Sequence, residues 1–271
     1  MGRLCWAHFL NRGFETCGST LPSQGLRLLM RYKSYSAAMK TLLVMDFDHT
    51  IIDDNSDTWI VKCAPEKKLP QELIDSYQKG KWNEYMGRVF KYLGDKSVEE
   101  GEIKKTMIKM PFTEGMLELI NFIGKNKDLY DCIIISDSNT AFIDWILKAA
   151  NVDSVFDKVF TNPAVFSRDG FLILEGFHVH ECDHCPKNLC KKKVLVEFID
   201  KQSQKGVKYS QINYIGDGEN DFCPITSLKK NDVAFARKGF TLYKMLSEPP
   251  QEFVPVESSV VGWTSVFKMC P

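Results

Sequence analysis

Continuous apolar runs, separated by helical patterns, dominate the chain from residue 41 onward. The runs lie at 41–47, 132–136, 158–161, 212–216 and 232–236, and helical spacing follows at 139–150, at 191–205 and, more briefly, after Glu219. Apolar runs without polar alternation are typical of strands that are buried on both faces of a parallel sheet. The alternation of strands and helices therefore predicts a doubly wound, Rossmann-like α/β fold.

One long interval interrupts this alternation between the first two strands. Residues 58–128 contain no convincing strand, whereas helical spacing recurs at 70–79, 82–93, 98–109 and 114–125. An all-helical insertion at this point is typical of a small cap above the carboxyl ends of the strands, where α/β sheets bind their ligands. We therefore predict a core domain of residues 40–57 and 129–271, a helical cap at 58–128, and a hairpin at 167–174 that decorates the sheet.

The N-terminal stretch, residues 1–39, differs in composition from the rest of the chain. Residues 1–40 contain six Lys or Arg residues and a single acid, Glu15. This composition, with a short amphipathic stretch at 25–32, suits a mitochondrial targeting peptide. The alternative, which we favour, is a disordered extension ahead of a domain that starts at Met39. The expected location is cytoplasmic, or mitochondrial if the extension is a targeting peptide.

Composition and charge exclude several classes of partner. The chain of 271 residues carries 35 Lys or Arg and 35 Asp or Glu, so its formal net charge is zero. Binding to nucleic acid or to an anionic membrane draws on an excess of basic side chains, which this chain lacks. Its apolar runs are far shorter than the roughly 18 to 20 residues that span a bilayer. We predict neither kind of partner, and the sequence gives no prediction of oligomeric state.

Polar residues with chemical potential follow the ends of several predicted strands. They are Asp46 and Asp48, Ser136 and Asp137, the basic run Lys191–Lys193, and the segment Gly216–Asp221, which contains Asp217. Alternate positions of an extended chain project to the same side, so Asp46 and Asp48 can act together. We expect Ser136 to lie where a helix begins, because a helix N-terminus can hold phosphate. Each feature is common alone, but the four in this order predict one site.

These four features resemble the motifs of the haloacid dehalogenase (HAD) superfamily of phosphatases. The longer segments 46–59, 185–191 and 216–224 are similar to the phosphoethanolamine/phosphocholine phosphatase family, and within it to the branch that acts on pyridoxal phosphate. The resemblance covers about residues 40–250. It implies a HAD core with an inserted cap, and it leaves open the fold of the last twenty residues, where such proteins have a final helix.

The resemblance implies a role in phosphoryl transfer for each residue of the predicted site. Asp46 would attack phosphorus and form an aspartyl-phosphate. Mg²⁺, which prefers oxygen ligands, would be held by Asp46, Asp217 and the backbone carbonyl of Asp48, with Asp221 nearby or acting through water. Asp48 would act as general acid and then as general base, which requires a raised pKa, and burial and neighbouring carboxylates favour one.

The remaining phosphate oxygens would be held by Ser136 and a lysine. We favour Lys191 over Lys193, because Lys191 begins the helix whose apolar pattern starts at 194–195.

Two further acids, Asp57 and Asp137, indicate what kind of phosphate binds. A second carboxylate beside a phosphate pocket is costly unless the substrate brings its own positive charge, as phosphoethanolamine, phosphocholine and a pyridinium ring do. The alternatives are that Asp57 caps a helix starting at Thr58 and that Asp137 is purely structural.

Nine cysteines occur along the chain, and Cys182, Cys185 and Cys190 cluster among histidines in the segment 178–190. This segment could supply four tetrahedral zinc ligands. However, a second CxxC pair at the usual distance is missing, so we favour a loop of reduced thiols and leave zinc out of the predicted site. We expect the other cysteines in apolar contexts, such as Cys223, to be separate buried thiols in a reducing compartment.

The sequence therefore predicts a Mg²⁺-dependent phosphatase that hydrolyses a small, cation-bearing phosphorylated metabolite through an aspartyl-phosphate. The resemblance favours pyridoxal 5′-phosphate as the substrate. The alternatives are a phosphoethanolamine/phosphocholine phosphatase, a phosphotransferase, and a non-catalytic, zinc-linked binding protein on a HAD scaffold.

Overall fold

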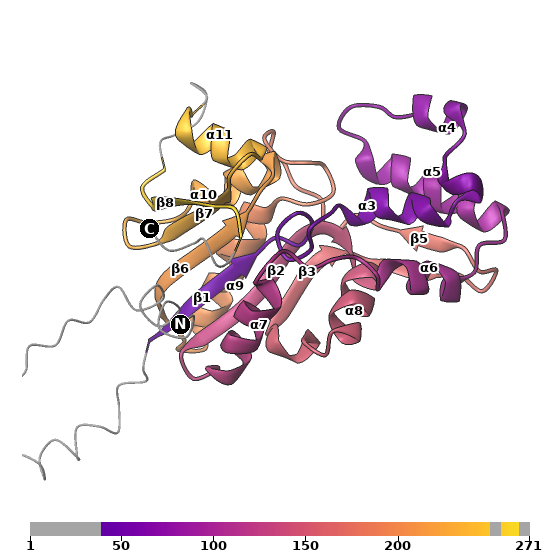
Figure 1. Ribbon diagram of the computed structural model, residues 1–271. Coiled ribbons are helices and arrows are strands. Elements are labelled where there is room, and N and C mark those ends of the chain that lie inside the picture. The colour runs from indigo at the N-terminus through magenta and orange to yellow at the C-terminus, as the bar shows by residue number, and fades with distance from the viewer. Residues whose placement is uncertain (1–38, 250–255, 266–271) are drawn as a thin grey trace, which may run out of the picture.

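Six parallel strands form the central sheet of the structure, a computed structural model that describes residues 39–249 and 256–265 (Figure 1). In chain order the strands are β1 (Lys40–Met45), β2 (Tyr130–Asn139), β3 (Lys158–Asn162), β6 (Tyr209–Gly216), β7 (Val233–Arg237) and β8 (Ser259–Trp263). Their order across the sheet is β3-β2-β1-β6-β7-β8, and each neighbouring pair is parallel. The predicted doubly wound α/β fold is confirmed. The extension expected at 1–39 lies, apart from Met39, outside the described residues.

The two faces of the sheet pack against separate hydrophobic cores. The flanking helices are α7 (Met116–Lys125), α8 (Thr140–Ala149), α9 (Lys191–Gln204), α10 (Phe222–Ile225) and α11 (Thr241–Ser247). Leu43 and Met45 of β1 share one core with α7 and α8. Leu42 and Val44 share the other with α9, α10 and α11. Because both faces are covered, β1 reads as one continuous apolar run.

The helices between β1 and α7 lie beyond the end toward which the strands point (Figure 1). They are α3 (Ser56–Trp59), two 3-10 turns at Ile60–Cys63 and Pro65–Lys67, α4 (Gln71–Asp75), α5 (Trp82–Asp95) and α6 (Glu100–Met107). The ring of Phe90 in α5 packs edge-on to Phe142 in α8, with centroids 5.8 Å apart. The helices expected at 82–93 and 98–109 are therefore present and share a core with the sheet domain, whereas the one expected at 114–125 is α7, which packs directly on β2.

A hairpin is present, but it starts before the predicted range of 167–174: β4 (Ala164–Phe166) and β5 (Leu172–Leu174) pair antiparallel. The two strands form a small sheet of their own, which packs against α5 and α8 (Figure 1). Gly94 of α5 permits this contact, since a Cβ at this position would overlap the ring of Phe171. The hairpin therefore joins the cap to the core.

Two elements differ from the sequence prediction. β2 continues past the predicted run at 132–136 to Asn139, so Ser136 lies within the strand and not where a helix begins, whereas α8 starts at Thr140, in agreement with the helix predicted at 139–150. The side-chain amide of Asn162 donates to the backbone carbonyls of Asp137 (2.6 Å) and Ser138 (3.0 Å), which holds this segment extended. The second difference is β8, a strand within the last twenty residues for which the sequence gave no prediction. Among the described helices, none is both long and apolar enough to span a membrane.

Candidate active site

A cavity of about 580 Å³ opens where β1, β2 and β6 end, between the sheet and the cap. Its wall includes six of the predicted site residues: Asp46, Asp48, Asp57, Ser136, Asp137 and Asp217. The other two, Lys191 and Asp221, are fully buried directly behind Asp46. The structure thus brings all eight predicted residues together.

Asp46 follows β1 directly and is held by backbone contacts on both sides. Its N–H donates to the carbonyl of Ile215 (2.9 Å), and its Oδ1 accepts the N–H of Phe47 (2.7 Å). The other oxygen lies 2.9 Å from Nζ of Lys191. Burial raises the pKa of Asp46 well above its usual value, and the Asp221 carboxylate raises it further, while Lys191 opposes both effects. Asp46 as a whole is only 5% exposed, and it lines the cavity with its carboxylate held by the contacts described above.

Lys191, the first residue of α9, bridges two carboxylates inside the protein. Its Nζ lies 2.8 Å from Oδ1 of Asp221 and 2.9 Å from Oδ2 of Asp46, and the side chain is 0% exposed. Burial alone would lower the pKa of Lys191, but the carboxylates of Asp221 and Asp46 raise it above its usual value. The ammonium is therefore charged. Lys193, by contrast, is exposed. The lysine beside Asp46 is therefore Lys191, the one favoured from the sequence.

Asp221 organises the loop after β6 through hydrogen bonds to both of its oxygens. One oxygen accepts the hydroxyl of Tyr214 (2.8 Å), and the other accepts the N–H groups of Asp217 (3.1 Å) and Gly218 (3.0 Å). A Cβ at Gly216 would lie 2.5 Å from this carboxylate, so glycine is needed for the approach. Asp221 therefore positions Asp217 rather than offering a free oxygen of its own.

The donor set around Asp46 fits a hard divalent cation. Carboxylate oxygens of Asp46, Asp217 and Asp221 lie within 4.8 Å of one another. Thr50 donates to Asp217 (3.2 Å), and burial and the Asp221 carboxylate raise the pKa of Asp217 to about 7. Mutual repulsion among buried carboxylates is the situation that a cation relieves, and Mg²⁺ prefers oxygen ligands of this kind. Asp46 and Asp217 are the residues that could hold it.

Asp48 is oriented by Ser56 at the start of α3. Its carboxylate accepts the N–H of Ser56 (2.8 Å) and the Ser56 hydroxyl (3.1 Å), and that hydroxyl also bonds to the hydroxyl of Ser138 (2.8 Å). Burial and the nearby Asp57 carboxylate raise the pKa of Asp48 to about 8. A carboxyl with such a pKa can carry a proton near neutral pH, which agrees with the expected shift.

Asp57 does not cap a helix, so that alternative interpretation is wrong. α3 begins at Ser56, and its N-cap is Asn55, whose side chain accepts the N–H of Thr58 (3.0 Å). The Asp57 carboxylate instead accepts Nε1–H of Trp82 (2.6 Å) and lines the cavity. Burial raises the pKa of Asp57 to about 6, which leaves it charged at neutral pH.

Asp137 is held by two amides from different segments. Oδ1 accepts from Asn188 (2.8 Å) and Oδ2 accepts from Asn220 (2.5 Å). Burial raises its pKa, whereas Lys191 lowers it. The neighbouring Ser136 lines the cavity, and its hydroxyl oxygen accepts the N–H of Ser138 (3.2 Å).

Sequence reasoning missed the residues that complete the cavity from other segments. Tyr77 and Lys79 come from the loop between α4 and α5, Trp82 is the first residue of α5, and Asn188 comes from the segment before α9. Tyr77 and Trp82 pack edge-to-face, with ring centroids 5.7 Å apart. In the sequence, the only hint of this part of the cavity is a pair of aromatic residues on either side of Gly80. That pair does not predict that the turn lies over the ends of the sheet strands.

Comparisons with known proteins agree with this geometry. A family model described as Putative Phosphatase matches residues 41–270. The pyridoxal phosphate phosphatase of Homo sapiens is 66% identical over 227 residues, which are 84% of this chain and 94% of that protein. A phosphoethanolamine/phosphocholine phosphatase of Gallus gallus is 42% identical over 230 residues, which are 83% of this chain and 85% of that protein. The apo crystal structure of a phosphoserine phosphatase, 16% identical, has a TM-score of 0.51 and covers 77% of this chain and 98% of that one, a likeness of fold.

Proposed function

The chain belongs to this phosphatase family, and on that premise we propose that it hydrolyses a small, cation-bearing phosphomonoester, with pyridoxal 5′-phosphate as the favoured substrate. The observation that carries the proposal is the Asp46 carboxylate, fixed between Lys191 and the backbone on the cavity wall, with Asp48, whose pKa burial raises to about 8, on the same wall. Family membership supports an enzyme over the non-catalytic alternative.

The chemistry divides between Asp46 and Asp48. An oxygen of Asp46 forms a bond to phosphorus while the ester P–O bond breaks, and Asp48 gives its proton to the departing alkoxide. In the second step Asp48 takes a proton from water, the resulting hydroxide adds to phosphorus, and the bond to Asp46 breaks to release phosphate. Lys191 stabilises the charge that develops near Asp46.

A divalent cation fits the first of these steps. Mg²⁺ held by Asp46, Asp217 and the backbone carbonyl of Asp48 would offset the repulsion between a phosphate dianion and the Asp46 carboxylate. Asp221 would support the cation site indirectly, by holding the loop that carries Asp217 and by pairing with Lys191, because protein donors already occupy both of its oxygens.

Binding of Mg²⁺ should be visible without any substrate. At a concentration one hundred times its Kd, the ion should add about 2.7 kcal/mol to the free energy of unfolding, because it binds the folded state alone. Asp217→Asn should abolish the resulting rise in Tm, measured by differential scanning calorimetry. Glu219→Gln, an exposed acid in the same loop, is the matched control and should keep the rise. A rise that survives Asp217→Asn would contradict the assignment of this residue.

Two further acids in the cavity wall, Asp57 and Asp137, support a substrate that carries a positive charge. The rings of Tyr77 and Trp82 lie beside Asp57, since Trp82 donates to the Asp57 carboxylate and packs against Tyr77. Aromatic faces and carboxylates together favour a flat or compact cation beside the phosphate. A pyridinium ring satisfies both.

Asp57→Asn should therefore separate cationic from neutral substrates. The amide oxygen can still accept the Trp82 hydrogen bond, so mainly the charge is lost. We expect kcat/KM for pyridoxal 5′-phosphate to fall about 10- to 100-fold, while kcat/KM for p-nitrophenyl phosphate changes by less than about 2-fold. Steady-state kinetics on both esters measures this difference. An equal loss on both would mean that Asp57 supports the cap instead of the substrate cation.

A direct test of the proposed function compares pyridoxal 5′-phosphate, phosphoethanolamine and phosphocholine in water enriched in ¹⁸O. The largest kcat/KM should belong to pyridoxal 5′-phosphate, and the released phosphate should carry one ¹⁸O atom from solvent. A larger value for either amine-bearing ester would favour the phosphoethanolamine/phosphocholine alternative. Transfer to an added alcohol, without ¹⁸O in the product, would show a phosphotransferase.

A further inference from the structure

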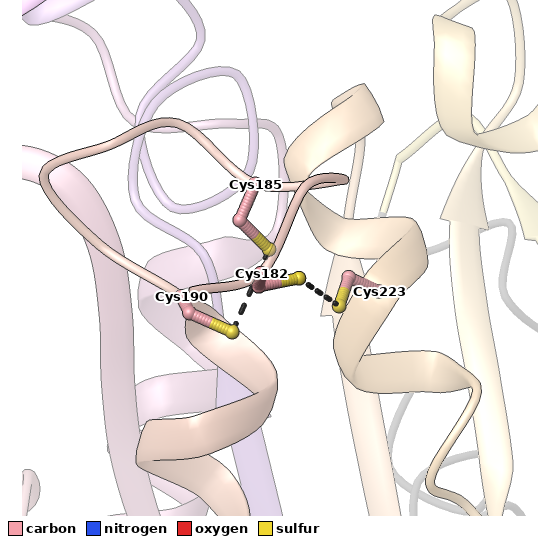
Figure 2. A group of neighbouring side chains, drawn as sticks. All are labelled: Cys182, Cys185, Cys190 and Cys223. Carbon is pink, nitrogen blue, oxygen red and sulfur yellow. Dashed lines mark hydrogen bonds between the residues drawn. The ribbon is translucent and has the colours of Figure 1, made fainter. Parts of the chain in front are cut away.

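Four cysteine side chains meet beside the active-site cavity, although they come from separate segments (Figure 2). Cys182, Cys185 and Cys190 lie in the segment before α9, and Cys223 lies in α10. All four sulfur atoms lie within 4.8 Å of one another. We propose that these four side chains bind one structural Zn²⁺ ion, a site separate from the carboxylates that would hold Mg²⁺.

The spacing of the sulfur atoms fits a single tetrahedral ion. A Zn–S bond of about 2.3 Å places the corners of a tetrahedron about 3.8 Å apart. The Sγ atoms of Cys182 and Cys223 are 3.8 Å apart, and those of Cys185 and Cys190 are 3.6 Å apart (Figure 2). Two opposite edges of the tetrahedron therefore already have the required length. Four protein ligands leave no open position, as in structural zinc sites.

The neighbouring histidines have other partners, which explains why the fourth ligand is Cys223. Nε2 of His178 accepts the N–H of Cys190 (3.2 Å). Nδ1 of His180 accepts the N–H of Cys182 (3.1 Å), and its Nε2 bonds to the carbonyl of Pro186 (2.8 Å). These rings hold the backbone of the loop in shape. The loop thus presents three sulfur atoms toward α10, where Cys223 completes the set.

The start of α9 favours a negatively charged sulfur at one corner. Cys190 is the N-cap of this 14-residue helix, and its Sγ accepts the N–H of Lys193 (3.5 Å). Thiolate ligands bind zinc in the deprotonated form, which the positive end of a helix stabilises.

The ion would brace the wall that carries the substrate-binding residues. Asn188 lies within the cysteine loop, and Asn220 lies just before Cys223, and both donate to the carboxylate of Asp137. Lys191 follows Cys190 directly. An ion that ties the loop to α10 therefore fixes the two amides against each other and fixes the start of α9. The zinc site itself does not depend on which phosphate the enzyme hydrolyses.

Metal analysis of the full-length protein, produced in zinc-supplemented medium, tests the proposal. We expect about one zinc per chain by inductively coupled plasma mass spectrometry, and less than about a tenth of that in Cys223→Ser. Cys63→Ser is the matched control, because Cys63 and Cys223 are each 6% exposed but Cys63 lies outside the cluster. This variant should keep the full zinc content.

A second set of measurements does not depend on whether Cys223→Ser folds. Exchange of the wild-type ion for Co²⁺ should give the intense visible bands of tetrahedral thiolate coordination. Cys182→Ser, at the most exposed of the four positions, should lose these bands, and Cys182→His should retain a tetrahedral spectrum. Zinc-free wild type with all four thiols reactive, iron in place of zinc, or unchanged zinc in Cys223→Ser would each overturn the proposal.

Discussion

Asp46→Asn is expected to lower kcat for phosphomonoester hydrolysis by at least about 10⁴-fold, because an amide cannot form the bond to phosphorus. The same change should leave Tm unchanged or raise it. The pKa of Asp46 lies above its usual value through burial and the Asp221 carboxylate, so its ionised form costs stability at neutral pH. Lys191 keeps a partner in Asp221 when the Asp46 charge is removed.

Calorimetry and single-turnover kinetics together separate a chemical role from a structural one. Beryllofluoride, which mimics a phosphoryl group on a carboxylate, should raise the Tm of the wild type and not that of Asp46→Asn. Activity of the variant above about one per cent of wild type would remove Asp46 from the nucleophile role, whatever its Tm.

Lys191→Met should damage both stability and turnover, unlike the change at Asp46. Removing the ammonium leaves two buried carboxylates, Asp46 and Asp221, without their shared counter-charge. Breaking a buried ion pair from one side costs about 3–5 kcal/mol of unfolding free energy, which corresponds to a fall in Tm of roughly 10 °C. Loss of the positive charge beside the reacting group should also lower kcat by about 10²- to 10³-fold.

Lys193→Met provides the matched control, since it makes the same change two residues along α9 at an exposed position. Its Tm and kcat should stay close to wild type. Thermal unfolding of the two variants side by side measures the difference. Similar losses in both would show that charge at the start of α9, rather than contact with Asp46, is what matters.

Most of the sheet could be predicted from the sequence because its inner strands are buried on both faces. Leu42 to Met45 alternate between two apolar cores, so every position of this part of β1 is hydrophobic. β8 was harder to predict from the sequence, because it is an edge strand of five residues in which only Trp263 is buried. Its place in the sheet depends on pairing with β7, which no local pattern records.

The same contrast applies to the candidate site: residues that follow predicted strands could be placed from the sequence, whereas residues that depend on contacts between distant segments could not. Asp46, Asp48 and Asp217 could be predicted because they follow strands that end at one edge of the sheet. Asp57 was ambiguous, since its role depends on where α3 begins and on a contact with Trp82 from another helix. Cys223 could not be joined to the cysteine loop, because only the packing of α10 beside the start of α9 brings them together.

The anchoring of the cap has a consequence for how substrate preference could be redesigned. α5 is fixed to α8 by Phe90 and Phe142, whereas α4 has no buried side chain. The loop after α4 nevertheless supplies Tyr77 to the cavity. Mutagenesis libraries confined to Gln71–Lys81 could therefore vary the mouth of the cavity at little cost to folding, whereas libraries in α5 would lose most of their members to misfolding.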